Sequence, residues 1–231
     1  MSATIGRQRT TCQSMPCIDD PLRGGPMRRT LPCLFLALSL PVAGVASAKS
    51  VSYTIDPNHT YPSFASDHMG ISKWRGKFDH TTGTITLDRA ARTGSVHIVT
   101  EVSSINFGLA ALDKQMLEPS FSGPMCKEHC NFFDAAKYPQ AVYDGKLTNF
   151  VNGEPTGVVG KLTLHGETRP LDLRIDSFKC IPDMMQRTRE RCGAEASTIF
   201  DRSKFGIDAG QSFGFDMNVA LQIQVEAVQD P

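Results

Sequence analysis

The chain of 231 residues balances 24 Lys and Arg against 24 Asp and Glu, and 40% of its residues are hydrophobic. This zero formal net charge removes the usual electrostatic basis for binding nucleic acid, and the apolar content is sufficient for a folded core. Long charge blocks, Gly-X-Y repeats and low-complexity tracts are absent from the sequence, which excludes the collagenous and disordered classes of protein.

The N-terminal segment has the features of an export signal. Arg28-Arg29 precedes a mostly apolar stretch over residues 31–45, and Ala46-Ser47-Ala48 is the small-residue pattern that signal peptidase recognises. Two prolines interrupt the apolar stretch, which is too short for a membrane-spanning helix.

We therefore predict a signal peptide over residues 27–48, cleaved after Ala48, and a periplasmic location for the mature protein. Residues 1–26 lie upstream of a complete signal peptide, so we interpret them as an over-extended N-terminus. The mature chain, residues 49–231, shows no internal linker and is expected to form one domain.

Four cysteines remain after the leader is removed: Cys126, Cys130, Cys180 and Cys192. An even number of cysteines in an exported chain favours disulfides, and four cysteines allow three connectivities. We favour Cys126–Cys130 and Cys180–Cys192, because each pair flanks a short irregular stretch. The alternative is a thiol or metal redox site at Cys126, His129 and Cys130, although a tetrahedral zinc site would need a fourth ligand.

Strands dominate the mature chain. The clearest period of two places Met217, Val219, Leu221, Ile223 and Val225 on one face. A similar pattern places Val96, Ile98 and Val102 on one face of a strand, with Val99, Ile105 and Phe107 on the other. Strands are predicted over residues 51–56, 73–79, 83–88, 95–107, 141–150, 158–165, 171–176, 194–200 and 217–227.

Turn residues separate these strands, notably at Asn152-Gly153 and His165-Gly166. Residues 108–117 are typical of a short helix, and a long loop follows through Pro139. About nine strands at regular spacing indicate an antiparallel barrel or sandwich, which periodicity alone does not separate.

One string matches a catalytic motif: Gly210-Gln211-Ser212-Phe213-Gly214 fits G-x-S-x-G. A nucleophile elbow needs a helix after the serine, whereas the clearest strand of the chain follows here, so we predict a glycine-rich turn. Phosphate-binding, dinucleotide-binding and zinc-protease motifs are absent from the sequence. We therefore expect a binding module with no catalytic residue, no cofactor and no resident metal.

Five strings occur in order along the mature chain: YTIDPNHT (53–60), RGKF (75–78), NFFDAAKYP (131–139), GKLTLHGETRP (160–170) and RSKFGI (202–207). With these strings the chain resembles the YceI-like family, bacterial periplasmic proteins that bind polyisoprenoids and related lipids. It differs from the family's pattern at Gln115, where His is frequent, and in the inserted segment SGPMCKEHC (122–130).

The resemblance implies an all-β fold, an eight-stranded antiparallel lipocalin-like barrel with a short helix and one long loop. Its interior would hold one long isoprenoid lipid, a polyprenyl or quinone tail. A strand of about 13 residues at ~3.3 Å each and ~40° tilt gives a barrel ~33 Å tall, roughly the reach of such a tail. Transient membrane contact and a homodimer are further expectations.

The expected ligand-binding residues are Phe78, Phe107, Met116 and Phe133, which could line a mouth near the helix and the long loop. Packing in the core is the simpler explanation for most of the large apolar residues, these four included, together with Phe64, Trp74, Phe132 and Phe205. We expect His59 and His68 to hold loops by hydrogen bonds. The competing interpretations are the redox site at the cysteines and a ligand-free stress-response module.

Overall fold

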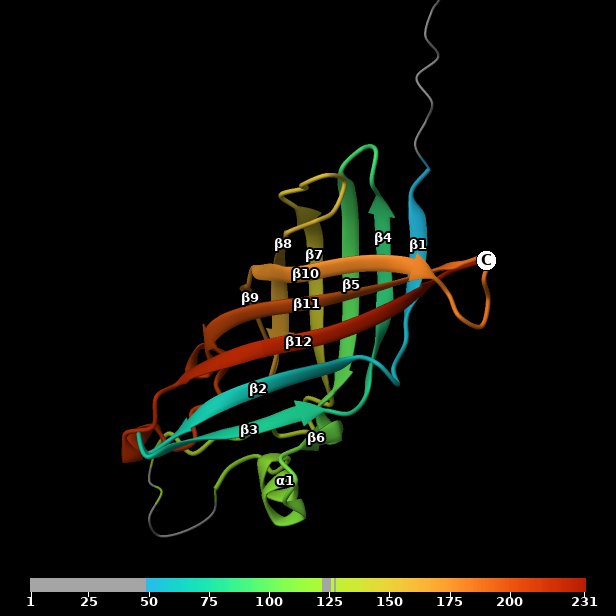
Figure 1. The fold of residues 1–231 in the computed structure, drawn as a ribbon. Coiled ribbons are helices and arrows are strands. Elements are labelled where there is room, and N and C mark those ends of the chain that lie inside the picture. Colours follow the sequence, from blue (N-terminus) through green and yellow to red (C-terminus); the bar gives the residue numbers. More distant parts are fainter. Residues whose placement is uncertain (1–48, 122–125, 127) are drawn as a thin grey trace, which may run out of the picture. The chain divides into compact units, whose positions relative to one another are not determined.

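The computed structural model describes residues 49–121, 126 and 128–231, so the predicted leader and most of the inserted segment's first half lie outside the described residues. Figure 1 shows the elements in chain order. Twelve strands are present: β1 (Val51–Ile55), β2 (Tyr61–His68), β3 (Ser72–Phe78), β4 (Thr81–Asp88), β5 (Thr93–Glu101), β6 (Ile105–Asn106), β7 (Gln140–Thr148), β8 (Gly157–Leu164), β9 (Glu167–Pro170), β10 (Leu173–Pro182), β11 (Glu190–Asp201) and β12 (Asn218–Gln229). The helices are the 3-10 turn η1 (Val102–Ser104), α1 (Ala110–Met116), η2 (Arg202–Phe205) and η3 (Gln211–Phe213).

Eight antiparallel strands close into a barrel in the order β1, β4, β5, β7, β8, β10, β11 and β12. Closure comes from β1, which pairs with β4 along one edge and with the C-terminal end of β12 along the other. In Figure 1, β4, β5, β7 and β8 run steeply behind β10, β11 and β12, which cross in front of them. The predicted eight-stranded barrel is confirmed.

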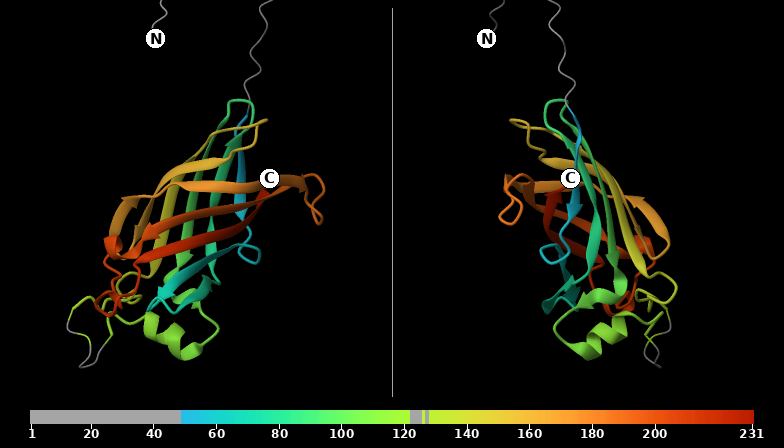
Figure 2. Two further views of the ribbon diagram at one scale, coloured as in Figure 1. Left: turned by 60° about the vertical axis from the view of Figure 1, so that its left-hand side comes forward. Right: turned by 90° about the vertical axis from the view of Figure 1, so that its right-hand side faces the viewer.

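Three further strands extend one end of the barrel wall. The N-terminal half of β12 pairs with β2, the hairpin partner of β3, and Lys77 and Phe78 pair with Asn106 and Ile105 of β6. Figures 1 and 2 show α1 beside β6 at this end, together with the β2–β3 turn and η3. Among the described residues, none of the helices has the length and apolar character needed to cross a membrane.

The interior face follows the predicted alternation along most strands. Val219, Leu221, Ile223 and Val225 of β12 all point into the barrel, and Met217 immediately before them is buried. β12 runs beside β11 over eleven residue pairs, which holds its period of two in register.

The prediction of one continuous strand over residues 95–107 was wrong. β5 ends at Glu101, and the 3-10 turn η1 shifts the side-chain phase before β6 begins. As a result Val102 and Ile105 are both buried, and Phe107 faces the barrel interior on the same side as Val96. Neither β2 nor β9 was predicted as a strand.

Turn chemistry explains the predicted hairpin positions. Asn152-Gly153 and His165-Gly166 each have two successive positive φ values, between 52° and 83°, which a tight turn in a two-residue hairpin requires. The predicted helix is confirmed as α1, and the long loop after it is tied to the helix end by backbone hydrogen bonds from Phe133 to Met116 and from Ala135 to Leu117. These bonds hold the loop across one end of the barrel.

Candidate functional site

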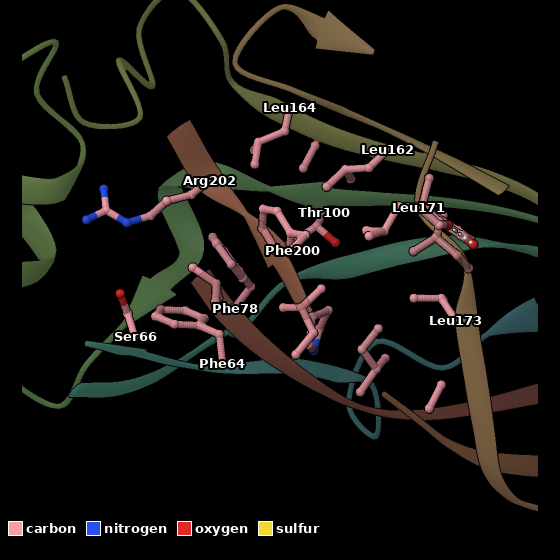
Figure 3. A pocket seen from close by; sticks show the side chains of 18 of the residues that line it. Phe64, Ser66, Phe78, Thr100, Leu162, Leu164, Leu171, Leu173, Phe200 and Arg202 are labelled. Atoms are coloured by element: carbon pink, nitrogen blue, oxygen red, sulfur yellow. Dashed lines mark hydrogen bonds between the residues drawn. The ribbon is translucent and has the colours of Figure 1, made fainter. Parts of the chain in front are cut away.

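The barrel encloses a cavity of about 650 Å³. Its wall is built mainly from aliphatic and aromatic side chains that alternate inward along the barrel strands. In Figure 3, Phe64, Phe78 and Phe200 approach one another from three strands, and Leu162 and Leu164 lie on the opposite wall. A cavity of this size and composition is within the range of small-molecule binding sites.

The two ends of the cavity differ in exposure. At the end near the β4–β5 turn, Tyr53, Leu87, Leu147 and Ala227 line the cavity and are buried, so this end is closed. At the other end the cavity is lined by Met69, Trp74 and Phe213, which are exposed, together with Leu112 and Met116 of α1. We call this second end the mouth, defined by Met69, Trp74, Leu112, Met116 and Phe213.

A polar cluster seals the closed end. The Tyr53 hydroxyl donates a hydrogen bond to Glu190 Oε2 at 2.6 Å, and Arg89 Nη2 donates to the same oxygen at 2.9 Å. Burial and the adjacent Glu190 carboxylate raise the pKa of Tyr53 to about 12, so this phenol stays protonated at neutral pH. The apolar chain of a ligand would therefore enter from the mouth and end against Tyr53.

The four predicted ligand-binding residues all line the cavity: Phe78, Phe107, Met116 and Phe133. The ring centroids of Phe78 and Phe133 lie 6.1 Å apart with near-perpendicular planes, which makes part of the wall an edge-to-face aromatic pair. The structure thus brings all four together near the mouth, and their contact with a ligand stays a prediction.

The residues interpreted as core divide into two groups. Phe64, Trp74 and Phe132 line the cavity, and the Phe64 ring lies 5.2 Å from that of Phe107. Phe205 instead packs into a separate small cluster with Leu164 and Ile207. The sequence did not identify Phe64, Trp74 and Phe132 as cavity residues, because side chains that line an apolar cavity and side chains in a packed core give the same apolar pattern.

Arg202 is a cavity-lining cation that sequence reasoning did not select. Its Nη1 and Nη2 donate to the backbone carbonyls of Ile207 and Ala209, and Figure 3 shows its guanidinium turned away from the apolar wall. Burial lowers the pKa of Arg202, and the nearby carboxylates of Asp208 and Asp201 act against this shift. These bonds hold the segment between β11 and β12 in place at the mouth end of the wall.

The two histidines behave differently. His59 Nδ1 lies 2.9 Å from Asp56 Oδ2 and so helps to hold the turn after β1, as expected. His68 lines the cavity, and its ring stacks on Trp74 with ring centroids 4.2 Å apart. It holds the β2–β3 turn through its backbone, whose carbonyl accepts a hydrogen bond from the N–H of Ile71, while its ring faces the barrel interior.

The described cysteines form two pairs, Cys126–Cys130 and Cys180–Cys192. The second pair joins directly opposed positions of β10 and β11. His129 does not join its neighbouring cysteines in a ligand set: its Nδ1 lies 3.1 Å from Asp208 Oδ2. Within the described ranges, three metal-ligating side chains converge only at Cys180, Glu190 and Cys192, where the two sulfurs are joined in the disulfide.

The G-x-S-x-G string forms a turn, as predicted. Gly210 and Gly214 both have positive φ, and a Cβ on Gly210 would overlap the ring of Phe215, so only glycine fits. The Ser212 hydroxyl donates to the backbone carbonyl of Glu128 at 2.7 Å, which ties η3 to the long loop. The following residues lead into β12, without the helix that a nucleophile elbow requires.

Two bacterial proteins are similar to this chain in sequence. A UPF0312 protein of Vibrio cholerae serotype O1 is 29% identical over 211 residues, covering 88% of this chain and 100% of the relative. A UPF0312 protein of Pseudomonas syringae pv. tomato is 27% identical over 149 residues, covering 64% of this chain and 72% of the relative.

Solved structures share the fold at lower identity. Burkholderia cenocepacia BcnA matches with a TM-score of 0.56 at 17% identity, covering 74% of this chain and 98% of that one. A polyisoprenoid binding domain from Saccharophagus degradans, implicated in plant cell wall breakdown, matches with a TM-score of 0.53 at 16% identity, covering 78% and 99%. The family profile described as YceI-like domain matches residues 53–227, which run from the first barrel strand into the last. The chain belongs to the YceI-like family.

Proposed function

We propose that this protein binds one long isoprenoid lipid, a polyprenyl or quinone tail, inside its barrel and stores or carries it as a binding protein rather than an enzyme. The observation that carries the proposal is the apolar cavity of about 650 Å³, closed at Tyr53 and open at the mouth. The family membership, and the similarity in fold to the polyisoprenoid binding domain of Saccharophagus degradans, support an isoprenoid among the possible lipids.

The cavity volume sets the length of chain that it encloses. If each chain carbon takes about the volume of a water molecule in the liquid, ~30 Å³, the cavity of about 650 Å³ holds roughly 20 carbons, or four isoprene units. A tail longer than this would extend through the mouth. Phe78, Phe107, Met116 and Phe133 would contact the part of the chain nearest the opening.

The energetics favour a carrier. Moving roughly 20 carbons from water into the barrel is worth about 16 kcal/mol at ~0.8 kcal/mol per CH₂, close to the ceiling of ~20 kcal/mol for noncovalent binding. A membrane lipid is not dissolved in water, however, so the relevant comparison is between the barrel and a bilayer. Because both are apolar, the net preference is small, and lipid can be taken up and released.

Export to the periplasm completes the proposal. The signal peptide predicted over residues 27–48 and the two cysteine pairs support it, since disulfides persist in oxidising compartments. The mass of the protein recovered from a periplasmic extract should correspond to a chain that starts at Lys49. Recovery of an uncleaved chain from the cytoplasm would contradict export.

Lipid uptake is the direct test of the binding function. Purified protein is incubated with a long-chain quinone in detergent micelles, and gel filtration then separates the protein from the micelles. We expect one quinone per chain in the protein peak, and the same elution would show whether the protein is a homodimer. If the protein elutes without quinone while circular dichroism shows that the barrel is still folded, the proposal is refuted.

A further inference from the structure

Exposed apolar side chains gather around the mouth. Met69 and Ile71 in the β2–β3 turn are 51% and 78% exposed, and Leu109 at the start of α1 is 59% exposed. Trp74 of β3 and Phe213 of η3 are also exposed. Figures 1 and 2 show the β2–β3 turn, η3 and α1 at the same end of the barrel. We call these five residues the rim.

The rim is continuous with the interior of the cavity. Met69, Trp74 and Phe213 are exposed to solvent and also line the cavity, so one apolar surface runs from the inner wall to the outside. His68 couples two parts of this surface, because its ring stacks on Trp74 and lies 5.2 Å from that of Phe215. Met69, Trp74 and Phe213 thus give a lipid chain that leaves the barrel an apolar path over the rim.

The cations of β3, beside the rim, are held within the strand: Arg75 donates to the backbone carbonyl of Lys73, and both lysines are paired with carboxylates. On β3, Lys73 Nζ lies 3.2 Å from Asp67 Oδ1 and Lys77 Nζ lies 2.7 Å from Asp79 Oδ1. Each lysine charge is therefore matched by a carboxylate beside it. A surface with this charge balance and an apolar edge suits a lipid bilayer, into which its side chains insert, better than a strongly charged partner.

We propose that the rim docks the open end of the barrel onto a lipid bilayer, by insertion of Met69, Ile71 and Leu109. This inference rests on the proposed function, since it supplies the step at which lipid enters or leaves the cavity. Because insertion is apolar, docking should depend little on anionic lipid or on salt concentration.

Trp74 provides a reporter within the rim. It is the single tryptophan of the chain, so a blue shift of tryptophan emission on adding vesicles reports on the rim alone. We expect this shift with vesicles of pure phosphatidylcholine, and the same affinity when phosphatidylglycerol is added or salt is raised. Co-sedimentation with the vesicles gives the affinity independently.

The decisive variant is the double change Met69→Ser and Ile71→Ser, with Ile199→Ser as its matched control. Ile199 is 68% exposed on β11 and lies on the outer face of the barrel wall. The rim variant should bind vesicles at least about tenfold more weakly, since full burial of one such side chain is worth about that factor. The control should bind as the wild type does.

Four results would overturn the docking proposal. Three come from the vesicle assay: failure of the wild-type protein to bind vesicles, binding that requires phosphatidylglycerol and is lost in salt, and equal loss of binding in the rim and Ile199 variants. A Trp74 shift that depends on protein concentration without vesicles would assign the rim to a second copy of the chain and also overturn it. Quinone uptake from detergent micelles tests the cavity separately, so a failure of docking and a failure of lipid binding are distinguishable.

Discussion

Filling the cavity should separate lipid binding from folding, and Ala196→Phe is the sharpest way to fill it. Ala196 lies on β11, is 7% exposed and lines the cavity between Ile175 and Ile223 on the two neighbouring strands. A phenylalanine here adds six carbons that project into the cavity. At up to ~30 Å³ each they occupy at most ~180 Å³, about a quarter of the volume of about 650 Å³.

The six added carbons displace about as many carbons of the bound chain. At ~0.8 kcal/mol per CH₂, exposing these carbons to water costs about 5 kcal/mol. The concentration of soluble protein loaded with lipid should therefore fall by roughly three orders of magnitude. The free energy of unfolding should stay the same or rise, because the ring fills space rather than displacing packed atoms. The assay is quinone extraction from vesicles into the supernatant, with urea unfolding measured in parallel.

The matched control is Ile199→Phe, on the same strand but on its exposed face, which should extract quinone as the wild type does. Two results would refute the reasoning. If Ala196→Phe extracts quinone normally, the chain does not bind in this cavity. If it destabilises the fold by ~1–3 kcal/mol, as overpacking of a filled core does, the interior is not open to a ligand.

Three further predictions concern stability. Tyr143→Phe should lower the free energy of unfolding by ~1–3 kcal/mol in urea titrations, because the Tyr143 hydroxyl donates to the buried carbonyl of Leu171 at 2.8 Å. The control Tyr61→Phe removes an exposed hydrogen bond and should cost under ~0.5 kcal/mol, so equal costs for the two variants would contradict the prediction. Acidification should destabilise the fold below about pH 4. Hydrogen bonds from Arg191 lower the pKa of Asp183. Burial acts to raise the pKa of Asp56, but hydrogen bonds from Arg191 and His59 outweigh this effect, so the pKa of Asp56 is lowered as well. Both carboxylates bind protons more readily in the unfolded chain, near their ordinary pKa of ~3.9. Their contribution to the free energy of unfolding is therefore complete above that pH and is lost as the pH falls through their lower pKa values in the folded state. Arg191→Met should flatten this loss of stability in acid, and an unchanged pH dependence would argue against the prediction. Removing the Cys180–Cys192 pair by a double change to Ser should lower the free energy of unfolding by about 3 kcal/mol, because the unfolded chain loses a loop constraint. Removing Cys126–Cys130, which closes a shorter loop, should lower it by about 2 kcal/mol. The reverse order in thermal unfolding would count against this ranking.

The fold could be predicted where one face of a strand meets an apolar interior and the other meets water. β12 is the clearest case, because Val219 to Val225 alternate without interruption. β2 escaped prediction because it lies at the mouth, where Ser66 and His68 take inward positions beside Phe64 and so remove the alternation. The phase shift at η1 could not be foreseen, since a 3-10 turn leaves no apolar signature of its own.

The candidate site was predictable in composition but not in extent. Phe78, Phe107, Met116 and Phe133 were selected for their position near a helix and a loop, and all four line the cavity. The backbone hydrogen bonds that the long loop donates to the end of α1 bring Met116 and Phe133 together. Arg202 was missed because its role depends on the carbonyls of Ile207 and Ala209, which meet it only after the chain turns between β11 and β12. Contacts of that kind follow from tertiary structure, not from local pattern.

Whether the barrel carries a lipid is decided by native mass spectrometry of the protein as isolated from a periplasm, followed by solvent extraction and identification of the lipid. The account predicts a single adduct per chain that extracts as a prenyl lipid, and its loss in the Ala196→Phe variant. A protein that shows no adduct after gentle isolation, and takes up no long-chain quinone, would contradict the account and favour a ligand-free barrel.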